Sequence, residues 1–277
     1  MSLAGVTIIM SGGSRGIGEA IAVRAAKDGA NVALLAKTAK PHPKLPGTIF
    51  TAAEAVEAAG GKALPLVGDV RDDDFVAEAV AKTAEAFGGI DVVVNNASAI
   101  DLSRTEDLPM KKYDLMNDIN CRGSFLLSKT ALPWLRTSAN PHILTLSPPL
   151  ELDPKWHTQH TAYTIAKFGM SLVTLGLSGE LRADGIAANS LWPRTAIDTA
   201  AVRNIVGDQM AGSSRTPEIM ADAAYEILTR PSAEFTGNFV IDEYLLADTG
   251  VTDFSQYLVE GAREEDLAGD LWVEPRV

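Results

Sequence analysis

The sequence predicts an α/β protein with a doubly wound, mostly parallel seven-stranded sheet and helices on both faces. Short β-branched runs alternate along the chain with longer Ala-rich or amphipathic segments, a pattern typical of parallel sheets covered by helices. A glycine-rich turn follows the first run, and no repeat or low-complexity linker interrupts the alternation. The 277 residues are therefore interpreted as one domain, residues 1–277.

The expected strands are rich in Val, Ile and Leu and are bounded by turn residues; they cover 6–10, 31–36, 63–67, 91–96, 142–147, 186–192 and 238–241. The expected helices lie between them, at 17–29, 49–60, 73–87, 113–136 and 161–182.

Two helix starts carry capping signals. Asp72 is well placed to cap the helix 73–87, and Thr216 followed by Pro217 and Glu218 predicts a further capped helix. A C-terminal extension from about residue 244 ends in the acidic stretch EGAREEDLAGD. Its simplest interpretation is a solvated tail.

The composition excludes several classes of protein. With a formal net charge of −12, nucleic acid is a poor partner, although a local site for a phosphorylated cofactor needs only a few cations. Cys121 is the only cysteine, so no internal disulfide can form. Neither a secretory signal nor a membrane-spanning apolar run is visible, and we expect a soluble, cytoplasmic protein.

The stretch SGGSRGIGEA places Gly12, Gly16 and Gly18 in the spacing G-x-x-x-G-x-G, after the first strand and before the first helix. Glycines allow a tight turn and close approach of the backbone to a pyrophosphate, which rests on the helix N-terminus. The alternative is an ordinary strand-to-helix turn. The context favours a dinucleotide site.

Three further motifs accompany this loop: NNAS at 95–98, Asn120 within MNDINCRG, and Tyr163 four residues before Lys167 in TAYTIAK. Together they resemble the short-chain dehydrogenase/reductase family, whose members have a Rossmann-type fold. A hydroxysteroid dehydrogenase-like branch of that family is similar over longer segments, at 37–49, 142–154, 162–170, 191–201 and 235–243. Eukaryotic members of that branch carry an added lipid-binding domain, and this chain ends at Val277 without one.

The resemblance implies a set of cofactor-binding residues: Gly12, Ser14, Arg15, Gly16, Ile17, Gly18, Lys37, Asp69, Val70, Asn95, Ala97, Tyr163, Lys167, Ile197 and Thr199. In the family an aspartate at the position of Asp69 accepts a hydrogen bond from the adenine amino group, and Asn95 helps to wall the adenosine pocket. Asp69 could instead cap the following helix.

The second strand ends without the acidic residue that binds a ribose 2′-hydroxyl, and Lys37 follows it. Lys37 and Arg15 would favour a 2′-phosphate, so NADP(H) is expected over NAD(H). Both cations could instead be surface groups. The proline-containing loop 37–48 could form a lid over the adenosine end or a simple surface connection.

One helical turn separates Tyr163 from Lys167, so both side chains lie on one helix face. A phenol has a pKa of about 10. A nearby ammonium group together with an oxidised nicotinamide would lower this pKa enough for general acid/base catalysis. By resemblance, Lys167 also binds the nicotinamide ribose and Asn120 positions a relay water. The alternatives are an exposed pair and a helix-interior asparagine bonded to backbone.

The catalytic serine is the least regular part of the resemblance. Ser147 ends the fifth strand but lies further before Tyr163 than the family's serine does, and Pro148 replaces the usual second serine. We expect Ser147 to contact the substrate oxygen; alternatively it only ends the strand and another donor serves. Arg194 stands where the family has glycine, and we favour a surface ion pair over a contact with an anionic substrate.

The sequence thus predicts an NADP(H)-dependent oxidoreductase that interconverts an alcohol and its carbonyl, on a small hydrophobic, lipid-like substrate. A dinucleotide-binding sensor or scaffold without turnover and an acyl-thioester ketoreductase remain alternatives. No metal site is expected, since His157 and His160 lack the i,i+4 spacing and further ligands. A homo-oligomer, dimer or tetramer, is expected, with contacts through the helices at 113–136 and 161–182.

Overall fold

The computed structural model describes residues 1–41, 46–206 and 212–273. Residues 42–45, within the loop considered above as a lid, lie outside this part. Its sheet has the order β3-β2-β1-β4-β5-β6-β7, and neighbouring strands in this order are parallel. The strands are β1 (Thr7–Ser11), β2 (Asn31–Ala36), β3 (Lys62–Val67), β4 (Val92–Asn95), β5 (His142–Thr145), β6 (Ala187–Trp192) and β7 (Phe239–Ile241).

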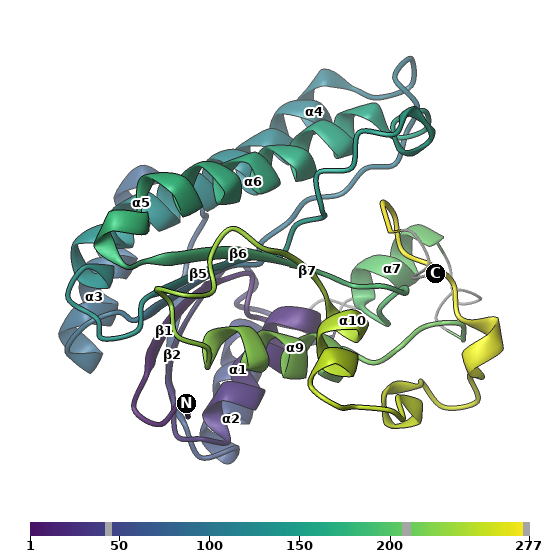
Figure 1. The fold of residues 1–277 in the computed structure, drawn as a ribbon. Coiled ribbons are helices and arrows are strands. Elements are labelled where there is room, and N and C mark those ends of the chain that lie inside the picture. The colour runs from purple at the N-terminus through teal and green to yellow at the C-terminus, as the bar shows by residue number, and fades with distance from the viewer. Residues whose placement is uncertain (42–45, 207–211, 274–277) are drawn as a thin grey trace.

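The helices form two layers, one on each face of the sheet (Figure 1). The layer on one face consists of α1 (Gly16–Ala26), α2 (Ile49–Ala58) and α9 (Glu218–Leu228), with α10 (Asp242–Asp248) packed beside α9. The layer on the other face consists of α3 (Asp73–Phe87), α4 (Met110–Asn117), α5 (Gly123–Leu135) and α6 (Thr161–Glu180). A short helix, α7 (Ala200–Val206), follows β6.

Two apolar cores explain this arrangement. Alternate side chains of each strand point to opposite faces, so Ile8 and Met10 pack against the layer of α1, α2 and α9, whereas Ile9 packs against the layer of α3, α5 and α6. Burial on both faces accounts for the near-continuous apolar strands. The doubly wound α/β fold expected from the sequence is confirmed.

The sheet order reverses between β1 and β4, because β2 and β3 lie on one side of β1 and β5 to β7 on the other. In open α/β sheets, ligands bind in the crevice at the carboxyl ends of the strands at such a switch point. The turns after β1, β3, β4 and β5 hold several of the residues that the sequence predicted for the site, among them Gly12, Asp69, Ala97 and Ser147.

The helix expected at 113–136 is divided in the structure. A π-helical turn, Asp118–Arg122, lies between α4 and α5. Such turns contain one extra residue and are frequent at functional sites, and this one contains Asn120.

Two capping predictions have different outcomes. The Asp72 carboxylate accepts hydrogen bonds from the backbone N–H groups of Asp74 and Phe75, so this cap is confirmed. The cap predicted for Thr216 is wrong: Pro217 occupies the capping position of α9, and no side chain caps the helix. The backbone of Thr216 instead donates to the carbonyl of Tyr257 in the C-terminal extension.

The solvated-tail interpretation of the extension is also only partly right. Within EGAREEDLAGD, Glu260 and residues 263–266 are exposed. Phe254 and Tyr257 are buried against the α1–α2–α9 core, and Trp272 is buried beside α6. These aromatic side chains attach the extension to the molecule, because each removes a large apolar area from water.

No helix in the described residues is both long and apolar enough to span a lipid bilayer.

Candidate active site

The loop between β1 and α1 is shaped by close backbone packing. Gly12 has a φ of +74°, and a Cβ there would lie 2.7 Å from the backbone of Ala97. A Cβ on Gly18 would lie 2.6 Å from the carbonyl oxygen of Gly12. Since no side chain fits at these two positions, the backbone can form the open cradle that a pyrophosphate requires at a helix N-terminus.

The residues that follow β4 support this loop, and one of them, Asn96, was not selected from the sequence. Asn96 Nδ2 donates to the Gly12 carbonyl at 2.8 Å, and the backbone of Ala97 donates to Ser11 Oγ at 3.2 Å. Asn95, expected to wall the adenosine pocket, is fully buried and donates to Ser128 Oγ of α5 at 2.9 Å. In this structure its side chain connects β4 to a helix.

The other predicted loop residues surround the cradle. Ser14 is buried, and Ile17 packs against the α1–α2–α9 core, to which Ile197 also belongs. The Thr199 side chain faces Gly16, since a Cβ on that glycine would lie 3.3 Å from Thr199 Cγ2. The segment after β6 is therefore brought against the glycine loop.

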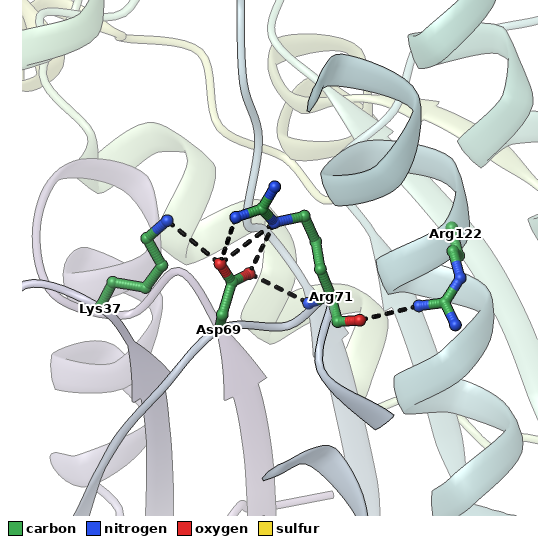
Figure 2. Close-up of polar contacts among 4 residues, drawn as sticks. All are labelled: Lys37, Asp69, Arg71 and Arg122. Carbon is green, nitrogen blue, oxygen red and sulfur yellow. Dashed lines mark hydrogen bonds and ion pairs between the residues drawn. The ribbon is translucent and has the colours of Figure 1, made fainter. Parts of the chain in front are cut away.

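A cluster of charges lies beyond the ends of β2 and β3; we call it the Asp69 cluster, and it comprises Lys37, Asp69, Arg71 and Arg122 (Figure 2). Figure 2 shows the Asp69 carboxylate between Lys37 and Arg71. Lys37 Nζ lies 3.1 Å from Asp69 Oδ2, and Arg71 Nη2 lies 2.6 Å from the same oxygen. Arg122 donates to the backbone carbonyl of Arg71 at 3.0 Å.

These contacts hold the pKa of Asp69 well below its usual range, chiefly through the hydrogen bonds from Arg71. Asp69 is thus an ionised acceptor at neutral pH. Arg71 was missed in the sequence analysis, although its position two residues after Asp69 allows the short-range contact that the structure contains. The other predicted cation, Arg15, donates to the Gly47 carbonyl at 3.1 Å, and Val70 is buried beside Gly123 of α5.

Tyr163 and Lys167 lie in the first turns of α6 and are both buried. Lys167 Nζ donates to the carbonyl of Leu146 at 2.6 Å and lies 4.9 Å from the ring centroid of Trp192. The contact with Leu146 ties the ammonium group to the residue next to Ser147. The pair is therefore not an exposed surface contact.

Burial dominates the titration of both groups. It lowers the pKa of Lys167 to about 7 and raises the pKa of Tyr163 above its ordinary value. Asp270 raises both, whereas a side-chain hydrogen bond with Ser98 lowers the pKa of Tyr163. The sequence analysis expected Lys167 to lower the tyrosine's pKa; in this structure desolvation outweighs any such effect.

Ser147 lies just beyond β5, is fully buried, and its Oγ has no hydrogen-bond partner among the described residues. Buried hydroxyl groups normally have a partner, so this one fits a contact with a bound molecule. Asn120 is different, because its side-chain amide makes two bonds with the backbone of Ala99, at 2.7 and 3.0 Å. It holds the loop that carries Ser98.

The C-terminal extension completes the surroundings of the tyrosine. Trp272 packs against Tyr163 with 5.7 Å between ring centroids, and Asp270 interacts electrostatically with Tyr163 and Lys167. We call Tyr163, Lys167, Trp192, Asp270 and Trp272 the Tyr163 cluster. Neither Asp270 nor Trp272 was singled out from the sequence; the only signal was the apolar group LWV directly after an acidic stretch.

Two other residues considered from the sequence have ordinary partners. Arg194 Nη1 lies 2.6 Å from Glu243 Oε1, as expected for an ion pair. His160 Nδ1 lies 2.7 Å from the Leu102 carbonyl. Among residues 1–41, 46–206 and 212–273, no group of His, Cys, Asp and Glu side chains could hold a metal ion.

Comparison with known proteins places this site in a family. A family model described as short chain dehydrogenase matches residues 6–209. Hydroxysteroid dehydrogenase-like protein 2 of Danio rerio is 58% identical over 258 residues, which is 93% of this chain and 62% of the relative. The chain thus spans less than two thirds of the length of that curated relative.

Two solved structures are similar over almost their whole length. A putative dehydrogenase from Xanthomonas campestris has a TM-score of 0.95 and 55% identity, covering 99% of this chain and 100% of that one. A short chain dehydrogenase from Mycobacterium thermoresistibile has a TM-score of 0.92 and 57% identity, covering 99% and 96%. The glycine cradle, the Tyr163–Lys167 pair and these similarities lead to one conclusion: the chain belongs to the short-chain dehydrogenase family.

Proposed function

We propose that the protein is an NADP(H)-dependent oxidoreductase that interconverts an apolar alcohol and its carbonyl, with Tyr163 as the general acid/base. The observation that carries this proposal is the burial of Tyr163 and Lys167 on one face of α6, beside the unpartnered hydroxyl of Ser147. Bound NADP⁺ would supply the hydride acceptor.

The residues divide the work by their positions. Tyr163 takes the proton from the alcohol, or returns it to the carbonyl. Ser147 Oγ donates to the substrate oxygen, because it has no competing partner in the described structure. Lys167 keeps a cation near the phenol, and Asn120 holds the Ala99 backbone in place.

Apolar surroundings support a hydrophobic substrate. The apolar side chains that share a buried cluster with Tyr163 include Met116, Phe168, Trp192 and Trp272. A neutral alcohol or ketone loses little on entering such a site, whereas an ionised group would lose its hydration.

The phosphorylated cofactor is supported by the Asp69 cluster and by the glycine cradle. A dianionic phosphate would gain charge-assisted hydrogen bonds from Lys37 and Arg71, which would share their donors between the phosphate and Asp69. The second strand ends without an acidic residue that would repel the phosphate. More distant structures of this fold were solved with NADP and with NAD, at 23% and 21% identity. The fold alone therefore does not choose between the two, and the preference rests on these side chains.

The test is oxidation of a panel of alcohols with NADP⁺, together with reduction of ketones and acyl thioesters with NADPH. We expect turnover of apolar alcohols and ketones, and Tyr163→Phe should lower kcat/KM by about 10²–10⁴-fold while NADPH binding is kept. Turnover of thioesters alone would assign the ketoreductase activity. Tight NADPH binding without any turnover would assign a sensor.

Ser147→Ala belongs in the same assay. If Ser147 is the oxygen donor, turnover should fall about tenfold or more, the cost of a lost hydrogen bond to a developing charge. Turnover near that of the wild type would give this role to another hydroxyl, and Ser98 is the first to examine because it bonds to Tyr163.

We also propose a homo-oligomer formed through α5 and α6. These two helices expose large apolar side chains, among them Phe125, Ile165, Leu172 and Leu175. Exposed apolar surface of this kind is common where a second copy docks. Sedimentation of the purified chain tests this proposal. A monomer at micromolar concentration would contradict it.

A further inference from the structure

The segment 268–273 is fastened to the chain beyond β6. Its backbone makes three hydrogen bonds: Ala196 N to Ala268 O at 2.9 Å, Asp270 N to Arg194 O at 3.0 Å, and Ala268 N to Ser213 O at 2.9 Å. These bonds involve backbone groups on both sides, so they hold the path of the segment independently of its side chains. At its end, the Trp272 ring contacts Tyr163 and Phe168 of α6.

Indole groups then fix its last described turn. Trp192 Nε1 donates to the Leu271 carbonyl at 2.9 Å, and Trp272 Nε1 donates to the Trp156 carbonyl at 3.2 Å. Both indole N–H groups thus have partners, which allows the rings to be buried without an unsatisfied donor.

The Trp272 ring lies at the centre of an aromatic group. Its centroid is 5.7 Å from that of Tyr163 and 5.6 Å from those of Phe168 and Trp192. Only 2% of Trp272 is exposed, and only 6% of Tyr163. The Trp272 ring therefore covers part of the Tyr163 ring and helps to bury it.

The backbone at Trp272 has a φ of +62°, and no other described non-glycine residue has a positive φ. This left-handed conformation is unfavourable for a bulky residue, because its Cβ crowds the backbone. Strained residues persist where their surroundings determine them and concentrate at functional sites. Here the surrounding aromatic contacts hold the ring in place against that cost.

We propose that residues 268–273 form the substrate-side wall of the active site, and that Trp272 limits the size of the neutral apolar molecule that reaches Tyr163. This inference rests on the proposed oxidoreductase function and adds to it the element that selects the substrate.

The wall can be tested with NADPH and a series of ketones of increasing ring number. Trp272→Ala opens the space of an indole, so kcat/KM for the bulkiest ketones should rise about tenfold relative to the smallest, about 1.4 kcal/mol of discrimination. In Trp272→Phe, which keeps an aromatic ring, the ratio of kcat/KM for the bulkiest to the smallest ketones should lie between those of the wild type and Trp272→Ala. Trp134→Ala is the matched control, since Trp134 lies on α5, far from Trp272 in the sequence, and is partly exposed.

A second measurement needs binding but no turnover. A bromine-bearing ketone added to the NADP⁺-loaded protein should quench tryptophan fluorescence, and Trp272→Phe should remove more of this quenching than Trp134→Phe. It also covers the case in which Trp272→Ala does not fold.

The outcomes separate the two proposals. An unchanged ketone profile in folded Trp272→Ala, with equal quenching in both Phe variants, would overturn the wall while leaving the oxidoreductase intact. A wild-type protein that neither binds nor turns over any apolar alcohol or ketone would overturn the proposed substrate class, and the wall with it.

Discussion

Asp69 and Asp270 are both aspartates close to a lysine, but their surroundings have opposite effects on them. Asp69 accepts hydrogen bonds from Arg71 and Lys37 at the edge of the sheet, and its pKa is lowered. Asp270 is near Lys167 and Asp242, and burial raises its pKa to about 7. Hydrogen-bonded cations decide the first case and desolvation decides the second.

This difference separates the two halves of the site. The Asp69 cluster is partly hydrated, so its ion pairs are weak and screened by salt. The Tyr163 cluster is enclosed by aromatic rings, so every charge in it is costly and strongly felt by its neighbours. The first half is suited to holding a charged ligand, and the second to controlling a proton.

The largest effect is expected in the enclosed half. Lys167→Met should lower kcat/KM at least about hundredfold, because the phenol loses its cation. The same change should not lower Tm at pH 6. Burial lowers the pKa of Lys167 to about 7, below about 10.4 for a free lysine, because the folded state disfavours the charged amine. The resulting cost to folding is largest below about pH 7, where the amine is charged in both the folded and the unfolded state, and it disappears as pH rises toward about 10.4.

Removing that amine therefore removes a cost to folding at low pH, which a thermal unfolding scan measures. Lys82→Met is the control, since Lys82 forms an exposed pair with Glu78 on α3. A Lys167→Met protein with activity within about threefold of the wild type would show that the enclosed amine has no part in the chemistry.

A smaller effect is expected in the hydrated half. NADPH should bind about tenfold or more tightly than NADH at low salt, and Lys37→Ala should narrow that ratio, because a charge-assisted hydrogen bond to phosphate is worth about 1.5–3 kcal/mol. Titrations at two salt concentrations measure it, and the ratio should decrease as salt rises.

Lys82→Ala provides a lysine of similar exposure, with side-chain exposures of 53% for Lys82 and 58% for Lys37. Equal affinities of the wild type for the two cofactors would refute the NADP(H) preference. If the ratio of NADPH to NADH affinity is the same in Lys37→Ala and Lys82→Ala, the preference would be assigned to other groups, such as Arg71.

The smallest effect concerns stability against pH. The folded-state pKa of Asp270, about 7, lies above the free value of about 3.9. The folded protein thus keeps a proton that the unfolded chain loses, and stability from this group declines as pH rises from about 4 to 7. Asp270→Asn cannot ionise, so its Tm should decline less over that range, by about 2–4 °C.

Asp242 also has a raised pKa, whereas the pKa of Lys167 is lowered. Because these groups also change stability with pH, neither the wild type nor Asp270→Asn should give a flat curve of Tm against pH. The exposed Asp107→Asn is the comparison. Identical pH curves for Asp270→Asn and the wild type would mean that Asp270 is ionised in the folded protein throughout.

The parts of the site that the sequence predicted are those set by neighbours in the chain. The spacing of Gly12, Gly16 and Gly18 encodes a backbone shape directly, and the four-residue interval between Tyr163 and Lys167 encodes a shared helix face. The doubly wound parallel architecture also followed, because strand–helix alternation leaves few topologies for a parallel sheet.

What the sequence did not predict depends on contacts between distant segments. The aromatic wall at Trp272 meets Tyr163 only because the extension returns across the end of β6. Asn95 and Asn96 are chemically identical, and which one faces the glycine loop depends on the pleat of β4. The direction of the pKa shift at Tyr163 depends on burial, which no motif encodes.

The π-helical turn at Asp118–Arg122 has a geometric consequence for the long helix that contains it. One additional residue advances the phase of an α-helix by about 100°, so the apolar stripe of α5 is rotated relative to that of α4. Met116 before the turn therefore packs in the same cluster as Tyr163, whereas Leu127 and Leu135 after it pack against the sheet in the core shared with α3 and α6. A single-residue deletion in this turn would restore regular pitch and force one of the two packing faces out of alignment.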